Sequence, residues 1–476
     1  MKIRWQPIVK IKTALLFQWY IFEGNKEKYF KSSLNLDFGL TNEKIISDEI
    51  FIDLNEWAKL EELLTSKAKM QREFLKKFTN LCYRHSDDLI KTAKQINRVK
   101  NWQRVKNNQL LSLYRKYQNS VLSLIPFLDT ILVLDNVLKK EITNLLESKL
   151  SIKDKKEQDL LLSKLIIPKK KSFFIKEQEA LLKIALKLQK DRKTDIRQDI
   201  KDYLKNYAWM GSLAYLGSFF TKKEAVKKIK EFLEEGPKEK LVKTKQIKRE
   251  TLENYRKAFN QIKQFPKLVD LIKIAQEFIY LQTYRMDVLF LAHWYAYSLW
   301  EKIGEHSGLT VDELVYLTGD EIINLLKRKR GVNRREIKAR LDNFALIKQN
   351  NRYTFLSGGK VRKVIQKVVR ETVVKGAVAN RGRATGKAKL LFGEKDMEKV
   401  NRGDIVVSPM TYPKFVPALA KASGIITDFG GILCHAAIVS REFGVPCIVG
   451  TENATKVFKD GDLVELNAYD GVARKV

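Results

Sequence analysis

The residue with the clearest capacity for chemistry is His435, at the centre of the stretch GGILCHAAIVSREFGVPCIVG, residues 430–450. An imidazole has an ordinary pKa of about 6.5, so it is largely neutral at pH 7 and can attack a phosphoryl group. If a helix begins here, its first backbone N–H groups lack internal partners and can stabilise the transferred anion. These features indicate a phosphohistidine site. A lone histidine at a helix start is more often a cap or a core residue. The choice between these roles and a phosphohistidine therefore depends on the surrounding sequence.

The sequence around this histidine predicts a strand, a tight turn, a short helix and a second strand. The apolar run 423–428 predicts the first strand, and Gly430-Gly431 permits a tight turn after it. The helix is expected at about 434–443, because Gly444 suits the left-handed cap that ends many helices. The second strand is expected at 447–449. The predicted elements therefore place the histidine at a helix N-terminus.

Five segments carry a longer pattern: GAVANRGRATGKA (376–388), GDIVVSPMTYP (403–413), TDFGG (427–431), CHAAIVSR (434–441) and GVPCIVG (444–450). In order and spacing, residues 374–476 resemble the mobile, or swivelling, phosphohistidine domain of the phosphoenolpyruvate-utilising enzymes. This family includes phosphoenolpyruvate synthase, pyruvate phosphate dikinase and rifampicin phosphotransferase. The resemblance implies that His435 is the catalytic, phosphorylated residue and that the domain is a small β/β/α fold.

Other residues near the histidine are also expected to contribute to the site. Three residues are expected to stabilise the phosphoryl group: Gly430, Gly431 and Cys434. Four others are expected to shape the site: Thr411, Pro413, Asp428 and Arg441. Leu433 stands where the family commonly has a threonine, so regulation by phosphorylation of that threonine does not carry over. No metal ligands are predicted.

Length and cysteine content limit the class of protein. A chain of 476 residues is expected to form two or three domains. Its three cysteines show neither a disulfide framework nor metal-ligand spacing, which favours a reducing, cytoplasmic location. The sequence shows no signal peptide, and no segment reaches the roughly 18 uncharged residues of a membrane span. A cytoplasmic protein without a membrane partner is the expectation.

The net charge of +34 is concentrated in the first part of the chain. Residues 371–476 contribute only +3, which leaves +31 on residues 1–370. A basic surface attracts nucleic acid and other polyanions. The lysines are scattered, however, and no nucleic-acid-binding motif is present. Nucleic acid is therefore not the expected partner, although a polyanion-binding role remains an alternative.

The region before the last hundred residues is predicted to be helical. Apolar residues three and four apart, with almost no glycine or proline, indicate amphipathic helices. Three helix starts carry capping boxes: Thr221/Glu224, Thr310/Glu313 and Thr318/Glu321. The first 56 residues are less readable, with a short strand possible at 49–53. The aromatic run 280–300 could line an acceptor pocket, but aromatic residues at helical spacing usually form core, and His293 and His306 are interpreted as structural.

The predicted architecture is multi-domain, with an all-α N-terminal and middle part followed by the C-terminal β/β/α swivelling domain. The expected segments are 1–56 of unclear structure, a helical domain 57–355, a linker 356–373 and the phosphohistidine domain 374–476. The whole resembles the last two-thirds of a rifampicin phosphotransferase-like or phosphoenolpyruvate synthase-like protein without its ATP-grasp domain. No Gly-rich phosphate loop followed by lysine is visible.

These expectations lead to one functional hypothesis and two alternatives. The hypothesis is a split phosphotransferase in which His435 carries a phosphoryl group to a small-molecule acceptor, pyruvate-like or other. This chain would bind no cofactor, and a separate ATP-grasp subunit would hold ATP and Mg²⁺. The alternatives are a non-catalytic scaffold or regulator with a degenerate mobile domain, and the polyanion-binding protein.

Overall fold

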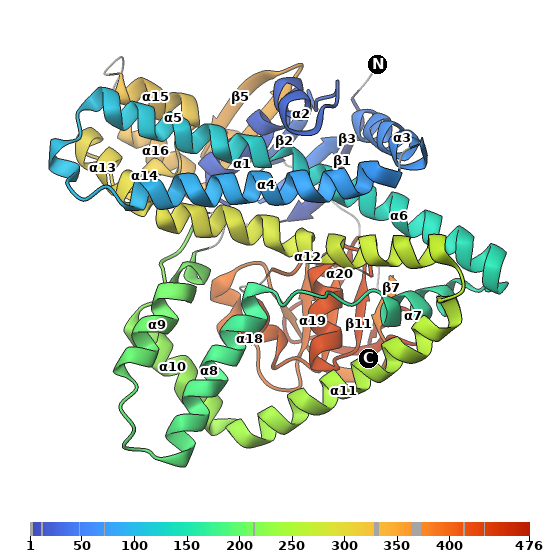
Figure 1. Ribbon diagram of the computed structural model, residues 1–476. Helices are drawn as coiled ribbons and strands as arrows, with labels where there is room; N and C mark the ends of the chain where they lie inside the picture. The colour runs from blue at the N-terminus through green and yellow to red at the C-terminus, as the bar shows by residue number, and fades with distance from the viewer. Residues whose placement is uncertain are drawn as a thin grey trace. The chain divides into compact units, whose positions relative to one another are not determined.

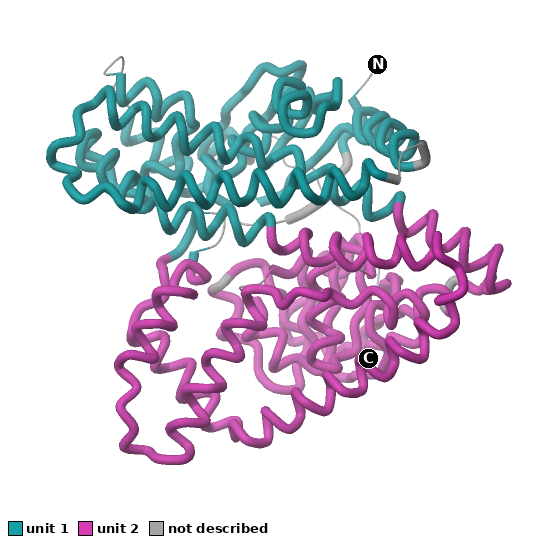
Figure 2. Tube along the Cα trace, in the orientation of Figure 1, with its two compact units in different colours: residues 1–137, 212–217, 285–368 teal, residues 138–211, 218–284, 369–476 magenta. Residues whose placement is uncertain are grey.

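The computed structural model describes residues 3–10, 13–46, 48–70, 72–212, 215–327, 333–362, 373–412, 415–432 and 434–476. The chain divides into two compact units, each built from distant parts of the sequence (Figure 2). The first unit contains residues 1–137, 212–217 and 285–368, and the second contains residues 138–211, 218–284 and 369–476. The expected boundaries of sequential domains remain predictions, because compactness does not show which segments fold independently.

The first unit contains a five-stranded antiparallel sheet. The strands lie in the order β1 (Trp5–Lys10), β3 (Glu49–Asp53), β2 (Glu43–Ile46), β4 (Phe344–Gln349) and β5 (Arg352–Ser357). The short strand expected at 49–53 is confirmed as β3. The N-terminal and middle part is largely helical, as predicted, but it is not all-α. The sheet escaped prediction because its strands are short and because β2 and β4 pair across about 300 residues of sequence.

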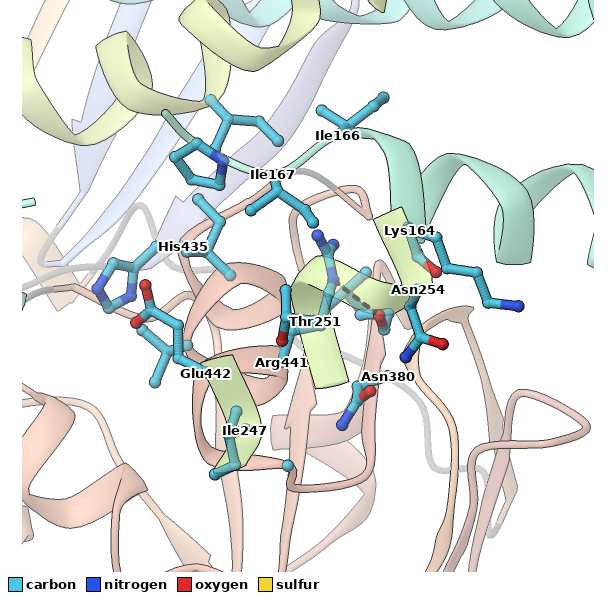
Figure 3. Close-up of a pocket in the computed structure, with 18 of the residues that line it drawn as sticks. Lys164, Ile166, Ile167, Ile247, Thr251, Asn254, Asn380, His435, Arg441 and Glu442 are labelled. Carbon is cyan, nitrogen blue, oxygen red and sulfur yellow. Dashed lines mark hydrogen bonds between the residues drawn. The ribbon is translucent and has the colours of Figure 1, made fainter. Parts of the chain in front are cut away.

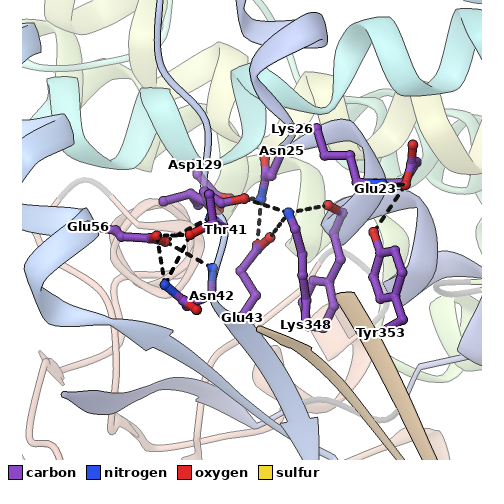
Figure 4. A network of polar contacts seen from close by, with 12 residues as sticks. Glu23, Asn25, Lys26, Thr41, Asn42, Glu43, Glu56, Asp129, Lys348 and Tyr353 are labelled. Carbon is purple, nitrogen blue, oxygen red and sulfur yellow. Dashed lines mark hydrogen bonds and ion pairs between the residues drawn. The ribbon is translucent and has the colours of Figure 1, made fainter. Parts of the chain in front are cut away.

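A buried polar network joins this sheet to its neighbouring helices (Figure 4). The fully buried ammonium of Lys348 on β4 lies 2.9 Å from a carboxylate oxygen of Glu43 on β2, and donates to the carbonyls of Phe22 and Leu40 at 2.6 Å each. The Asn25 side chain donates to Glu43 at 2.7 Å. Burial raises the pKa of Glu43 to about 7, although Lys348 acts in the opposite direction. The ammonium is satisfied on three sides, as a buried charge requires.

Helices make up the rest of the first unit (Figure 1). They are α1 (Leu15–Gly24), α2 (Glu27–Leu34), α3 (Leu54–Met70), α4 (Arg72–Asn97), α5 (Asn107–Leu124), α13 (Tyr297–Ser307), α14 (Val311–Leu314), α15 (Gly319–Leu326), α16 (Arg334–Asp342) and α17 (Gly359–Arg362). α6 (Pro126–Leu150) and α12 (Pro266–Tyr295) contribute residues to both units. The capping boxes predicted at Thr310 and Thr318 are confirmed at the starts of α14 and α15.

Several helices of the second unit precede its sheet in sequence. They are α7 (Lys155–Leu165), α8 (Phe173–Lys190), α9 (Arg197–Tyr207), α10 (Lys222–Glu234) and α11 (Pro237–Ile262). Thr221 and Glu224 form the predicted capping box of α10, and Gly236 adopts a left-handed conformation before Pro237 opens α11. Only Pro237, Ala258 and Ile262 of α11 are buried. Much of this long helix therefore keeps a face available to solvent or to a ligand.

The C-terminal part of the second unit is an eight-stranded sheet. The strand order is β6 (Val373–Lys375), β13 (Val472–Lys475), β12 (Leu463–Asn467), β8 (Arg383–Leu390), β9 (Ile405–Ser408), β10 (Gly424–Thr427), β11 (Cys447–Val449) and β7 (Ala377–Asn380). Strands β8 to β11 are parallel. Short helix α18 (Val416–Leu419) connects β9 to β10, and α19 (His435–Phe443) connects β10 to β11. Helix α20 (Ala454–Val457) lies between β11 and β12. All residues of β9 and β10 are buried, and Ile405, Val406, Val407, Ile425 and Ile426 give these strands the apolar character expected of central parallel strands.

One helical stretch, Asn107–Leu150, is long and apolar enough to cross a membrane. Its most apolar window has a mean hydropathy of 1.9, and 72% of that window is buried inside the structure. Core helices of proteins that do not enter membranes pass the same test, so this stretch is weak evidence for a membrane span.

Candidate functional site

The strand, turn, helix and strand predicted around His435 are all present. The expected first strand is β10, the helix is α19 and the second strand is β11. Gly430 has φ +109°, a conformation that favours glycine, and Cys434 caps the helix in an extended conformation. Gly444 closes the helix with φ +65°. Because each signal acts locally, these elements could be predicted without knowledge of the fold.

The imidazole of His435 is held by one side chain of the neighbouring strand region. The Thr411 hydroxyl lies 2.8 Å from His435 Nδ1, and Thr411 itself is buried. No described residue forms a hydrogen bond with His435 Nε2. The imidazole keeps some exposure, but the protein around it displaces water and lowers its pKa to about 3. His435 is therefore neutral at pH 7, and one ring nitrogen is left for chemistry.

The turn and the helix start supply backbone donors near the histidine. The Cys434 N–H is already bonded to the Gly431 carbonyl at 2.9 Å. The first bond inside the helix runs from the Ile438 N–H to the Cys434 carbonyl at 3.0 Å. The amides of residues 435–437 lie before that bond, at the positive end of the helix. These three amides can donate hydrogen bonds to an anion at this end, whereas the amide of Cys434 is already bonded to Gly431.

Two of the residues expected to shape the site hold the surrounding backbone in place. Asp428 is buried and accepts hydrogen bonds from the Thr455 N–H, at 2.9 Å, and from the Thr455 hydroxyl. Burial raises the pKa of Asp428, while the bonds from Thr455 act against this rise. Arg441 donates from Nε to the Ala379 carbonyl at 3.2 Å and from a terminal nitrogen to the Ile432 carbonyl. Pro413, the fourth residue of this set, lies outside the described residues.

A cavity of about 1480 Å³ lies within the second unit and opens onto His435 (Figure 3). α19 contributes one wall with His435, Ile438, Arg441 and Glu442, and β7 contributes Asn380. Other walls come from α7, the connection between α7 and α8, α8, α11 and α12, with Lys164, Ile166, Ile167, Ile247, Thr251 and Asn254 among their residues. Of the predicted site residues, Gly430, His435 and Arg441 line the cavity, whereas Asp428 does not.

Glu442 lines the cavity, although no motif in the sequence indicates a role for it. It lies seven residues after His435, and such a spacing returns to the same face of a helix after two turns. Burial raises the pKa of Glu442 to about 7, and the neighbouring Arg441 acts to lower it. The helical spacing could have drawn attention to this carboxyl group, but only the cavity shows that it faces the same space as the imidazole.

The other aromatic and histidine residues divide between core and cavity. Tyr280 lines the cavity, in keeping with the idea of an acceptor pocket. Trp300 is fully buried in the first unit, and His293 is buried there against the ring of Tyr215, with centroids 4.1 Å apart. Burial lowers the pKa of His293 to about 3. Within the described ranges, no group of three or more His, Cys, Asp or Glu side chains could hold a metal ion.

Comparison with known proteins identifies the C-terminal part of the chain. Residues 400–471 match a family model described as "PEP-utilising enzyme, mobile domain". A probable phosphoenolpyruvate synthase from Archaeoglobus fulgidus is 53% identical over 100 residues, which are 21% of this chain and 13% of that protein. Its counterpart from Methanothermobacter thermautotrophicus is 50% identical over 103 residues, 22% of this chain and 15% of its own length. The resemblance expected for the end of the chain is confirmed.

The similarity does not extend over whole proteins. A probable phosphoenolpyruvate synthase from Pyrococcus horikoshii is 35% identical over 182 residues, 37% of this chain and 22% of that protein. The chain thus matches less than a quarter of the length of each of these three relatives. The wider likeness to rifampicin phosphotransferase-like proteins remains a prediction from the sequence.

Proposed function

We propose that His435, in this phosphoenolpyruvate-utilising enzyme mobile domain, carries a phosphoryl group from a nucleotide-bound donor to a small-molecule acceptor. The observation that carries the proposal is a neutral imidazole at the start of α19, with Nδ1 held by Thr411 and with the residue lining a cavity beside other polar residues. A neutral imidazole is nucleophilic, and backbone amides at a helix start favour the anion that it would receive.

The attacking atom in this proposal is Nε2. If Nδ1 keeps its proton and donates it to the Thr411 hydroxyl, the lone pair of the ring lies on Nε2. The phosphoryl group then joins Nε2 as its bond to the donor breaks, and the contact with Thr411 orients the ring. The amides of residues 435–437 would receive the phosphoryl oxygens.

The donor that we propose is ATP, held with Mg²⁺ by a separate ATP-grasp subunit. One histidine has to visit both donor and acceptor, so the proposal includes a swinging motion of the β/β/α domain 374–476. The expected hinge is the linker 356–373, of which residues 363–372 lie outside the described residues. The names of the relatives support an acceptor connected with phosphoenolpyruvate, such as pyruvate, and a cytoplasmic location is proposed with it.

Incorporation of acid-labile, base-stable phosphate tests this function. The full chain and its His435→Ala variant are incubated with β- or γ-labelled ATP and an extract of the source organism, which supplies the partner subunit. Label in the wild type alone is the expected result, and the labelled position shows which phosphate is used. No label, in an extract that phosphorylates a complete relative, would reject the carrier role in favour of a scaffold.

A further inference from the structure

We propose that Glu442 takes the proton from the acceptor when the phosphoryl group leaves His435, and that the acceptor is a hydroxyl-bearing molecule bound in the cavity of the second unit. The inference rests on the proposed function of His435. It adds a catalytic residue, Glu442, and a substrate class to that function.

His435 and Glu442 occupy the same face of α19. Seven residues of helix place their Cα atoms about 10 Å apart along the axis. Side chains in a helix incline toward its N-terminus, which directs Glu442 back toward the imidazole. Both residues line the cavity, and in Figure 3 their side chains point to the same end of it. An acceptor bound along this face of α19 could contact the phosphoryl group on His435 at one end and the Glu442 carboxylate at the other.

The surroundings of Glu442 suit a group that exchanges a proton near pH 7. Its side chain is partly buried, and no described residue donates a hydrogen bond to its carboxylate. The pKa of about 7, raised by burial, gives both protonation states in the physiological range. Arg441 is the charged neighbour on its own helix. The other walls bring further charged side chains to the cavity: Asp154, Asp159, Lys164, Lys169, Lys170, Lys171, Glu179, Lys248, Glu250, Lys375, Arg381 and Asp470.

The opposite walls suggest the body of the acceptor. Ile166 and Ile167, between α7 and α8, and Ile247 on α11 present apolar surface to the cavity. Thr251 and Asn254, on the same side of α11, can form hydrogen bonds. This mixture favours a molecule with an apolar body and a few polar groups over a small anion such as pyruvate. The cavity and the names of the relatives therefore point to different acceptors.

The transfer balances with these residues alone. The hydroxyl oxygen of the acceptor forms a bond to phosphorus while the bond from phosphorus to His435 Nε2 breaks. The hydroxyl proton passes to the Glu442 carboxylate, and the electron pair of the broken bond returns to Nε2. The imidazole leaves as a neutral group because Nδ1 keeps its proton beside Thr411. A carboxylate acceptor has no such proton at pH 7 and would not need Glu442.

The test uses 1-butanol and water as hydroxyl probes. The full chain is phosphorylated on histidine with potassium phosphoramidate, which needs no partner subunit, and the loss of phosphate to both probes is followed by ³¹P NMR. Glu442→Gln should lose phosphate about 100-fold more slowly than the wild type, as is typical when a general base is removed. The wild-type rate should rise with pH through about 7, as the carboxylate forms, whereas the variant should lack this rise.

Two comparisons keep the outcomes distinct. Glu398→Gln removes an exposed carboxylate that does not line the cavity, and it should behave as the wild type. Equal rates and pH profiles for the wild type and Glu442→Gln, with equal thermal unfolding, would overturn the role of Glu442 and leave the carrier role standing. A wild-type chain without phosphate on His435 would reject the carrier role itself, and the assignment of Glu442 with it.

Discussion

The hydroxyl of Thr411 lies 2.8 Å from Nδ1 of His435, and it joins the loop after β9 to the first residue of α19. This contact links two segments that the sequence separates by 24 residues. It orients the ring and occupies Nδ1, which leaves Nε2 for the proposed reaction. The contact therefore connects the fold of the sheet to the proposed reactivity of the histidine.

Replacing Thr411 tests this contact. Thr411→Val keeps the shape of the side chain but removes the hydroxyl, so phosphorylation of His435 should slow by about 5- to 10-fold, as expected for a hydrogen bond worth about 1 kcal/mol. Thr411→Ser retains the hydroxyl and should restore most of the rate. The rates are measured by phosphate incorporation from phosphoramidate. Equal rates for the valine and serine variants would show that the hydroxyl has no part in the reaction.

The protonation of His435 should be unusual. Desolvation lowers its pKa from the ordinary 6.5 to about 3, so the imidazole should remain neutral between pH 8 and pH 5 in the folded chain. The unfolded chain takes up the proton below about 6.5, so the folded state should lose stability as the pH falls from there toward 3. NMR of the ring protons and urea unfolding of wild type and His435→Gln measure these effects. A midpoint near 6.5 in the folded chain would contradict the desolvated site.

The two glycines of the turn should differ in their tolerance of a side chain. A Cβ at Gly430 would lie 2.8 Å from Cys434 Sγ, and φ there is +109°. Gly430→Ala should therefore cost about 1–3 kcal/mol of stability and slow phosphorylation. Gly431→Ala is the matched control, since a Cβ there meets no atom of the described residues within 4 Å. Thermal unfolding compares them, and equal losses of stability would show that the turn is not constrained as described.

The buried ion pair of the first unit makes a separate prediction about stability. Lys348→Met leaves the carboxylate of Glu43 buried without its cation, which should cost about 3–5 kcal/mol. Adding Glu43→Leu removes the unpaired group and should recover most of that loss. The free energy of unfolding from urea denaturation, followed through a signal of this unit, provides the comparison. A double variant no more stable than the single one would refute this account of the network in Figure 4.

The strand, helix and capping boxes near His435 could be predicted because their signals are local. Gly444 determines where α19 ends, and Thr221 and Thr310 begin helices through contacts only three residues long. The resemblance to a known family also depended on short segments in a fixed order. The place of His435 within one of these segments was enough to predict it as the phosphorylated residue.

Other features depended on contacts between distant residues. Lys348 looks like a surface lysine in the sequence, and only its pairing opposite Glu43 across β2 and β4 explains its burial. In the sequence, Glu442 is one more charged residue near a helix end, directly after Arg441. Only the cavity, which both residues line, indicates that Glu442 could take part in a reaction at His435. Such long-range pairings leave no periodic signal in a single sequence.

The carrier role of His435 is tested most directly by ³¹P NMR of the full chain after treatment with phosphoramidate, with wild type beside His435→Ala. We expect one phosphohistidine signal in the wild type, with phosphorus coupled to an imidazole at Nε2, and its loss in the variant. A signal of equal intensity in His435→Ala, or phosphate joined to Nδ1 of His435, would contradict it.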